Sequence, residues 1–234
     1  MSEVPVITVD GPGGTGKGTL CWALARDLGW RFLDSGALYR ALAHKALEAG
    51  VPLDDADRLA GLARGLSVAF VPRPGSEEPA TLVDGKDASE AIRTEACASA
   101  ASRLAALPAV RDALLGLQRD FRHPPGLVAD GRDMGTVVFP DAPLKLFLTA
   151  SAEARAERRY KQLKEKGISV SLARLSADIA ERDARDQERA VSPLKPARDA
   201  VVIDTTALDK QEVRRQVLRL VRDRFPDVPE SLLS

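Results

Sequence analysis

The residues best suited to chemistry form a glycine-rich run with a lysine and two hydroxyls near the amino end of the chain. Glycines let consecutive backbone N–H groups curl around phosphate oxygens, because they accept positive φ without steric cost. A helix that follows such a loop points its positive end at the same oxygens. The run consists of Gly11, Pro12, Gly13, Gly14, Thr15, Gly16, Lys17, Gly18 and Thr19. We predict that it binds the phosphates of ATP.

The loop fits Gly-x-x-x-x-Gly-Lys, but Gly18 stands where Ser or Thr usually follows, and Thr19 supplies the hydroxyl one position later. Switch GTPases also need an Asn- or Thr-Lys-x-Asp motif for guanine. The chain contains no asparagine and no Thr-Lys pair, which argues against a GTPase. The form of the loop at 16–19 resembles that of nucleoside monophosphate kinases, whose donor and acceptor are both anions. Arginines should therefore be abundant elsewhere.

Two arginine-rich stripes follow in the second half of the chain. Phosphoryl transfer needs in-line positioning and positive charge on the moving group. Helical spacing places Arg182, Asp186 and Arg189 on one face at i, i+4 and i+7. A second stripe consists of Arg155, Arg158 and Arg159. The spacing alone favours solvated helix faces with surface ion pairs.

Two further constellations stand at the ends of expected strands. Asp130, Gly131, Arg132 and Asp133 follow an apolar run, at the edge where open α/β sheets bind ligands. The pattern leaves a capped strand end and a functional turn equally open. The segment 34–40 reads as a strand end, a helix cap and a first helical turn.

Short apolar runs alternate with segments of helical spacing, which predicts an open α/β sheet with helices on both faces. Expected helices cover 94–107 and 108–121. The segments 66–71 and 80–83 predict a small β-rich insertion that ends in an Asp-Gly turn. The five runs expected to form buried parallel strands are 6–9, 31–33, 127–129, 144–148 and 200–203.

Charge and cysteine content limit the possible classes of function. The 34 Lys and Arg residues balance 34 Asp and Glu residues, so no global charge attracts nucleic acid or a membrane surface. Cys21 and Cys97 are too few for a disulfide framework and too far apart for a metal knuckle. We expect residues 1–5 and the apolar run after them to be neither a signal peptide nor a membrane span, because the N-terminus carries an acid and no Lys or Arg, and the run is short. We expect a cytoplasmic protein.

Taken together, these segments resemble the bacterial cytidylate kinase family. The block 130–142 is the most specific and separates this family from adenylate, guanylate and thymidylate kinases. The matching segments run in order from residue 6 to about residue 206, so the resemblance covers nearly the whole chain. They are 6–12, 16–19, 34–40, 92–94, 130–142 and 181–183 with Asp186 and Arg189.

The resemblance implies an α/β fold with a parallel five-stranded P-loop core sheet, a small β-rich acceptor-binding insertion and a helical lid. The implied kinase domain covers about 6–225. Its parts are a core of 1–65, 88–153 and 171–234, an insertion whose β-rich part is 66–87, and a lid of 154–170.

The resemblance also implies roles for individual residues. The cytosine ring would be read by Ser102, Arg111 and Asp133, the sugar would be held by Tyr39, Arg182 and Asp186, and the acceptor phosphate would be bound by Arg40, Arg132 and Arg189. Ser35 joins this substrate-binding set. The expected catalytic residues are Lys17, Arg132, Arg155, Arg158, Arg159 and Arg189. Mg²⁺ would accompany ATP, with contacts through water from Thr19 or Asp130.

The implied activity is phosphorylation of CMP and dCMP by ATP, through direct in-line transfer, in pyrimidine nucleotide metabolism. Alternatives are a P-loop kinase for another monophosphate or small metabolite, and a nucleotide-binding regulatory protein that transfers no phosphate. We expect a monomer that binds neither nucleic acid nor membranes. Several relatives have Ser where this chain has Gly13, so one hydroxyl contact to the acceptor phosphate is expected to be missing.

Overall fold

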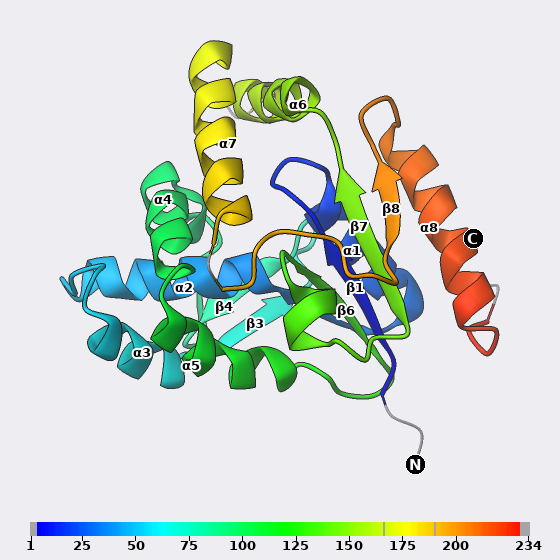
Figure 1. The fold of residues 1–234 in the computed structure, drawn as a ribbon, viewed down its shortest axis with the longest axis horizontal. Helices are drawn as coiled ribbons and strands as arrows, with labels where there is room; N and C mark the ends of the chain where they lie inside the picture. Colours follow the sequence, from blue (N-terminus) through cyan, green and yellow to red (C-terminus); the bar gives the residue numbers. More distant parts are fainter. Residues whose placement is uncertain (1–3, 166, 190, 230–234) are drawn as a thin grey trace. The chain divides into compact units, whose positions relative to one another are not determined.

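The main sheet has five strands in the order β2-β6-β1-β7-β8. The structure, a computed structural model, describes residues 4–165, 167–189 and 191–229 (Figure 1). The limits 1 and 234 of the predicted core therefore lie outside the described residues. Strand β1 pairs in parallel with β7, β2 with β6, and β7 with β8. The strands are β1 (Val6–Asp10), β2 (Arg31–Asp34), β6 (Leu127–Gly131), β7 (Leu144–Thr149) and β8 (Val201–Asp204). The α/β class and the positions of all five predicted strands are confirmed. The prediction that all five are buried is wrong for β8, which lies at the edge of the sheet and leaves Val201 and Val202 39% and 55% exposed.

The chain divides into two compact units. The first unit contains the described residues up to Val6 together with Cys21–Gly131. The second contains Ile7–Leu20 and the described residues from Arg132 onward. Helix α1 (Lys17–Leu28) begins in the second unit and ends in the first.

In the first unit a small antiparallel sheet occupies the segment predicted to be β-rich. Asp84 and Gly85, both at positive φ, form its second turn, as the Asp-Gly pair predicts. Phe70 joins this sheet to the core, because its ring centroid lies 5.2 Å from that of Phe32 and 5.8 Å from that of Phe121. The strands are β3 (Val68–Val71), β4 (Ala80–Val83) and β5 (Lys86–Asp87).

Four helices of the first unit carry several of the predicted acceptor-binding residues. They are α2 (Ser35–Glu48), α3 (Ala56–Arg64), α4 (Glu95–Leu104) and α5 (Pro108–Arg119). Helix α2 begins where expected, because the Asp34 carboxylate accepts a hydrogen bond from the Ala37 N–H at 2.8 Å. Helices α4 and α5 confirm the two helices predicted over 94–121.

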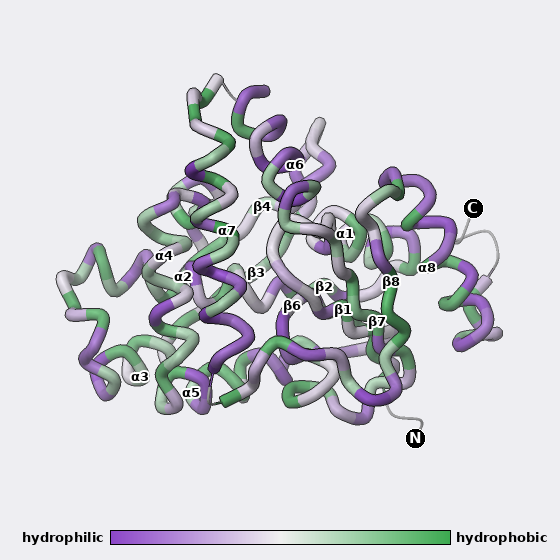
Figure 2. The backbone as a smooth tube through the Cα atoms, turned by 45° about the horizontal axis from the view of Figure 1, so that its top comes forward, coloured by the Kyte–Doolittle hydropathy of each residue, from purple (hydrophilic) through white to green (hydrophobic). Residues whose placement is uncertain are grey.

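The second unit adds three helices to β1, β7 and β8: α6 (Ala152–Glu165), α7 (Leu172–Gln187) and α8 (Lys210–Arg224). Helix α8 is amphipathic: its tube in Figure 2 carries both hydrophilic and hydrophobic residues, and Val213, Val217 and Val221 are buried. An Asp209–Glu212 capping box fixes its start. Within the described residues, no helix combines the length and apolar character needed to cross a membrane.

Candidate functional site

The glycine-rich loop lies between the end of β1 and the start of α1, as predicted. Gly11 has φ 143°, and a Cβ atom there would lie 2.0 Å from the carbonyl oxygen of Leu148 on β7. Gly14 and Gly16 also have positive φ, at 83° and 91°. The backbone therefore needs glycine at these positions to turn back from the sheet into α1.

The lysine of the loop is buried, with 5% of its surface exposed. Its Nζ donates to the carbonyl oxygen of Pro12 at 2.7 Å and lies 3.5 Å from the Thr15 hydroxyl. The Thr15 hydroxyl also donates to Pro12, at 3.2 Å. The ammonium group of Lys17 is thus hydrogen-bonded within the loop itself.

A cluster of arginines surrounds Asp186, whose side chain is almost completely buried. Arg132 Nε donates to Asp186 Oδ2 at 3.0 Å, and Arg189 donates to Oδ1. Burial favours the neutral acid, but the guanidinium groups of Arg132, Arg189 and Arg182 together hold the pKa of Asp186 below its usual value. This cluster gathers guanidinium groups that can bind an anion such as a phosphate group.

The helical face predicted for this cluster is wrong at one position. Helix α7 ends at Gln187, so Arg189 is not the i+7 member of the face. The chain turns back after the helix: Ser192 adopts φ 53°, and the Leu194 N–H donates to the carbonyl oxygen of Asp186 at 2.8 Å. This bond satisfies a carbonyl at the end of the helix. Arg189 reaches Asp186 from the turn instead.

Arg155 on α6 is buried, so a solvated face is the wrong interpretation of this position. Its guanidinium group donates to both carboxylate oxygens of Asp183 and, through Nη1, to the carbonyl oxygen of Gly13 at 3.2 Å. Arg155 Nε also donates to the carbonyl oxygen of Ala150, at 3.1 Å. Arg155 therefore ties the phosphate loop to α7, and Asp183 is a partner that the sequence did not indicate.

The other two predicted lid arginines have different environments. Arg158 Nη1 donates to the Thr205 hydroxyl at 3.1 Å, and its Nη2 donates to the Thr205 carbonyl oxygen just after β8. The Thr205 hydroxyl lies 3.4 Å from the carbonyl oxygen of Thr15 in the phosphate loop. Arg159 is half-buried. Arg155 therefore contacts the phosphate loop directly, and Arg158 contacts it through Thr205.

The predicted acceptor residues of α2 lie in the first unit. The Ser35 hydroxyl donates to Gln118 Oε1 on α5 at 2.7 Å, and Tyr39 is buried. Arg40 pairs with Asp34 at 2.9 Å, and among the residues that the structure describes its buried Nε has no hydrogen-bond partner. Arg40 is therefore fixed at one end of its guanidinium group and can donate from the other.

Ser102 on α4 and Arg111 on α5 are also in the first unit, and both side chains are buried. The Ser102 hydroxyl has no hydrogen-bond partner within the described residues. Arg111 Nη1 donates to the carbonyl oxygen of Ala105 at 3.2 Å. A buried hydroxyl without a partner is costly, which is the property expected of a group that a ligand satisfies.

The turn after β6 contains Arg132 and Asp133, and Asp133 precedes a π-helical turn, Met134–Val138. A residue outside the predicted set holds this turn. The carboxylate of Asp10, the last residue of β1, accepts hydrogen bonds from the Met134 and Gly135 N–H groups, both at 2.8 Å. Its position directly before the glycine-rich loop was the only local signal of a role.

The described residues contain no group of three or more His, Cys, Asp and Glu side chains that could hold a metal. Thr19 is half-buried and Asp130 is buried. Magnesium commonly takes one or two protein ligands and completes its shell with water and phosphate oxygens. The hydroxyl of Thr19 and the carboxylate of Asp130, taken singly, are each oxygen ligands of the kind that magnesium prefers.

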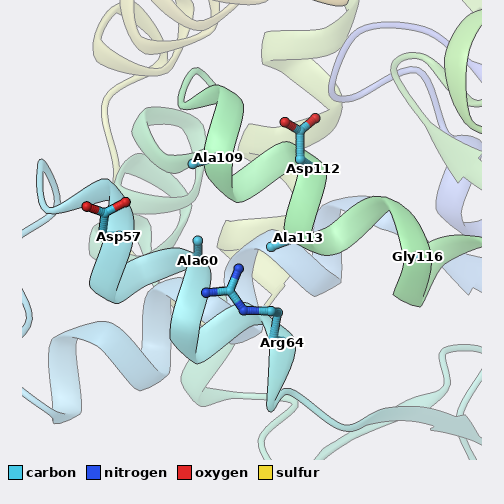
Figure 3. A pocket seen from close by; sticks show the side chains of 7 residues that line it. All are labelled: Asp57, Ala60, Arg64, Ala109, Asp112, Ala113 and Gly116. Carbon is cyan, nitrogen blue, oxygen red and sulfur yellow. The ribbon is translucent and has the colours of Figure 1, made fainter.

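A pocket of about 740 Å³ lies elsewhere, between α3 and α5 in the first unit (Figure 3). Asp57, Arg64 and Asp112 line it with small residues, Ala60, Ala109, Ala113 and Gly116. None of the predicted site residues lines this pocket. Two carboxylates against one arginine are unsuited to a phosphate ester, so we do not assign the site to it.

Comparison with known proteins identifies relatives over nearly the whole chain. The family model described as "Cytidylate kinase" matches residues 7–223. A protein named cytidylate kinase from Methylococcus capsulatus is 58% identical over 95% of this chain and 99% of its own length. The corresponding proteins of Stutzerimonas stutzeri and Klebsiella pneumoniae are 57% and 54% identical, over 96% of this chain and 98% of their own lengths.

Proposed function

We propose that this chain, which belongs to the cytidylate kinase family, transfers the γ-phosphoryl group of ATP to CMP and dCMP. The products are ADP and CDP or dCDP. The observation that carries the proposal is the arginine cluster beside the phosphate loop. A Cβ atom on Gly13 would lie 3.6 Å from Arg132 Nη2 and 3.9 Å from Arg182 Nη1. Two adjacent anion sites suit a phosphorylated donor and a phosphorylated acceptor.

On the donor side, the loop 11–19 holds the phosphates of ATP through its backbone N–H groups. Lys17, with Arg155, Arg158 and Arg159, stabilises negative charge on the transferred group. Thr19 and Asp130 would hold a magnesium ion bound to ATP through water, and the ion would supply further positive charge to the phosphates.

On the acceptor side, cytosine offers an amino donor beside ring nitrogen and carbonyl acceptors. Asp133 accepts from the amino group, while Arg111 and Ser102 donate to the acceptors. Tyr39, Arg182 and Asp186 hold the sugar, and Ser35 supports this side of the site. Arg40, Arg132 and Arg189 bind the acceptor phosphate.

The acceptor oxygen is already anionic, so the reaction needs no general base and no covalent intermediate. It attacks the γ-phosphorus in line with the departing ADP oxygen. Closure of a lid at 154–170 excludes water that would otherwise hydrolyse ATP. We further propose that 66–87 belongs to an acceptor-binding insertion, and that the protein acts as a monomer in the cytoplasm.

The test is ADP release with ATP and magnesium, across CMP, dCMP, UMP, AMP and GMP as acceptors. We expect turnover of CMP and dCMP above the others. Rapid turnover of another monophosphate without CDP would instead identify a different kinase. ATP binding with no acceptor-dependent turnover would favour a regulatory protein.

Replacing Asp133 with alanine should remove discrimination between CMP and UMP. The carboxylate accepts from the cytosine amino group, which uracil lacks, so its loss penalises CMP selectively. We expect kcat/KM for CMP to fall about a hundredfold, since a site built for a hydrogen bond discriminates strongly. UMP should change much less. Equal losses for both nucleotides would place Asp133 away from the base.

Replacing Gly13 with serine should strengthen acceptor binding. The new Cβ has room, since its nearest neighbours are Arg132 Nη2 at 3.6 Å and Arg182 Nη1 at 3.9 Å. The added hydroxyl can donate to the acceptor phosphate, so KM for CMP should fall about threefold, as for one exposed hydrogen bond. Gly13→Ala is the matched control, and it should leave KM unchanged. Equal effects of both substitutions would exclude a hydroxyl contact.

A further inference from the structure

Asp10 is a buried carboxylate for which the phosphoryl transfer proposed above provides no role. Its side chain is 4% exposed. Asp10 connects the phosphate loop with the turn that contains Asp133. Gly11 of the loop follows it directly, and its carboxylate accepts hydrogen bonds from the two residues after Asp133. All of these residues belong to the second unit. Burying a carboxylate is costly unless its hydrogen bonds are satisfied, so the position calls for an explanation.

The two bonds fix both ends of the carboxylate. Oδ1 accepts from Met134 N–H and Oδ2 from Gly135 N–H, each at 2.8 Å. These are the first two N–H groups of the π-helical turn, at the end where Asp133 lies. A bidentate carboxylate resists both translation and rotation of the peptide groups that it binds. The position of Asp133 therefore depends on the last residue of β1.

The other side of the turn is closely packed. A Cβ atom on Gly135 would lie 2.9 Å from the Thr8 hydroxyl and 3.2 Å from Lys145 Cδ. The turn is thus held between Asp10 and the surface formed by Thr8 and Lys145. Little space remains for it to move toward that surface, and the two bonds from Asp10 hold its first two N–H groups from the other side.

We propose that Asp10 is a positioning residue that holds the cytosine-reading carboxylate of Asp133 in register with the ATP phosphate loop. This inference rests on the proposed function. Asp10 touches neither nucleotide. It determines where Asp133 and Arg132 stand relative to Gly11 and the loop that follows.

The protonation state of Asp10 should be visible in the reaction. Burial raises the pKa of Asp10 to about 7, although the Gly135 and Met134 N–H groups lower it. Asp133 raises this pKa further, and Lys17 lowers it. Lys145 on β7 also faces the turn, but its ammonium bonds Pro140 and Asp199. A protonated carboxyl cannot accept from both N–H groups, so the hold on the turn weakens as the pH falls through 7.

The test compares Asp10→Asn with the wild type, using kcat/KM for CMP and UMP together with KM for ATP. An amide keeps one acceptor and presents a donor to the other N–H group. We expect the CMP/UMP ratio to fall about tenfold, as for one lost buried hydrogen bond, while KM for ATP changes less than about threefold. Thr8→Val is the matched control on the same strand, because the Thr8 hydroxyl has no partner within the described residues. It should leave the ratio unchanged.

A second readout is the CMP/UMP ratio of the wild type between pH 6 and 8.5. Phosphate ionisation, near pH 6, is common to both nucleotides and cancels in the ratio. We expect the ratio to fall toward pH 6 in the wild type and to stay flat in Asp10→Asn. If the variant does not fold, the wild-type profile decides, and a flat profile overturns the proposal. An unchanged CMP/UMP ratio in a folded Asp10→Asn variant also overturns the proposal. So does an equal rise in the KM for CMP and the KM for ATP. Absence of CDP formation by the wild type would overturn the proposed function as well.

Discussion

Replacing Lys17 with methionine is expected to lower kcat about a thousandfold, with only a small change in KM for CMP. The ammonium group is the cation of the phosphate loop, and it donates hydrogen bonds to the Pro12 carbonyl oxygen and the Thr15 hydroxyl. Removing a group that stabilises charge in the transition state costs about 3–4 kcal/mol, which corresponds to a factor of about a hundred to a thousand in rate. Methionine preserves length and burial, so the loop should keep its shape. Steady-state kinetics with ATP and CMP measure the effect.

Lys45→Met is the control for this change. Lys45 forms an ion pair with Asp84 at 2.6 Å, away from the phosphate loop in sequence, and the pair is partly exposed. Exposed ion pairs contribute about 0–1 kcal/mol, so kcat should be unaffected. A fall in kcat of less than about tenfold for Lys17→Met would contradict the role given to the ammonium group.

Replacing Asp186 with alanine is expected to damage both stability and acceptor binding. The carboxylate is the shared partner of Arg132 and Arg189, and its loss leaves these guanidinium groups facing one another. Removing one member of a buried ion pair costs about 3–5 kcal/mol. Because Arg132 keeps 18% of its side chain exposed, we expect the lower end of that range. The melting temperature should fall by roughly 10 °C, and KM for CMP should rise at least tenfold.

The pH dependence of this loss provides a check on its cause. The native pKa of Asp186 is lowered, so the ion pairs stabilise the fold above the ordinary Asp value and lose their effect as the pH falls through the native value. The stability difference between wild type and variant should therefore narrow below about pH 4. Glu181→Ala, on the exposed side of the same helix, should change stability by less than about 0.5 kcal/mol. A comparable loss of stability in Asp186→Ala and Glu181→Ala would contradict the contribution assigned to the buried ion pairs.

The parts of the molecule that were predictable are those encoded locally. The strands of the main sheet are short β-branched runs, and the glycine-rich composition of the loop 11–19 predicts a tight turn between a strand and a helix, as observed. Gly11 shows why the pattern is so strict, because any side chain would collide with the Leu148 carbonyl oxygen. The Asp84-Gly85 turn was likewise recognisable from two residues.

The contacts that the sequence did not indicate depend on where distant segments of the chain fold. The burial of Arg155 comes from Asp183 and Gly13, and no spacing rule connects these positions. Arg189 reaches Asp186 because the chain reverses after α7, whereas the charged residues of the sequence keep helical spacing through Arg189. The family resemblance provided roles for Ser102 and Arg111, which stand in ordinary helical contexts and would otherwise pass as core residues.

The hydrogen bonds of Asp10 impose an order of events on a chain that is still being synthesised. Its two partners lie 124 and 125 positions later, and the carbonyl group that Gly11 packs against belongs to Leu148. At about 5–20 residues per second, the ribosome needs roughly 6–25 s to supply the turn after the loop has been made. During that interval the nascent loop has its complete motif and its own internal bonds, but it lacks the Leu148 carbonyl group and the turn that Asp10 binds. A chain that terminates before β7 would therefore retain the signature of a nucleotide site without the means to build one.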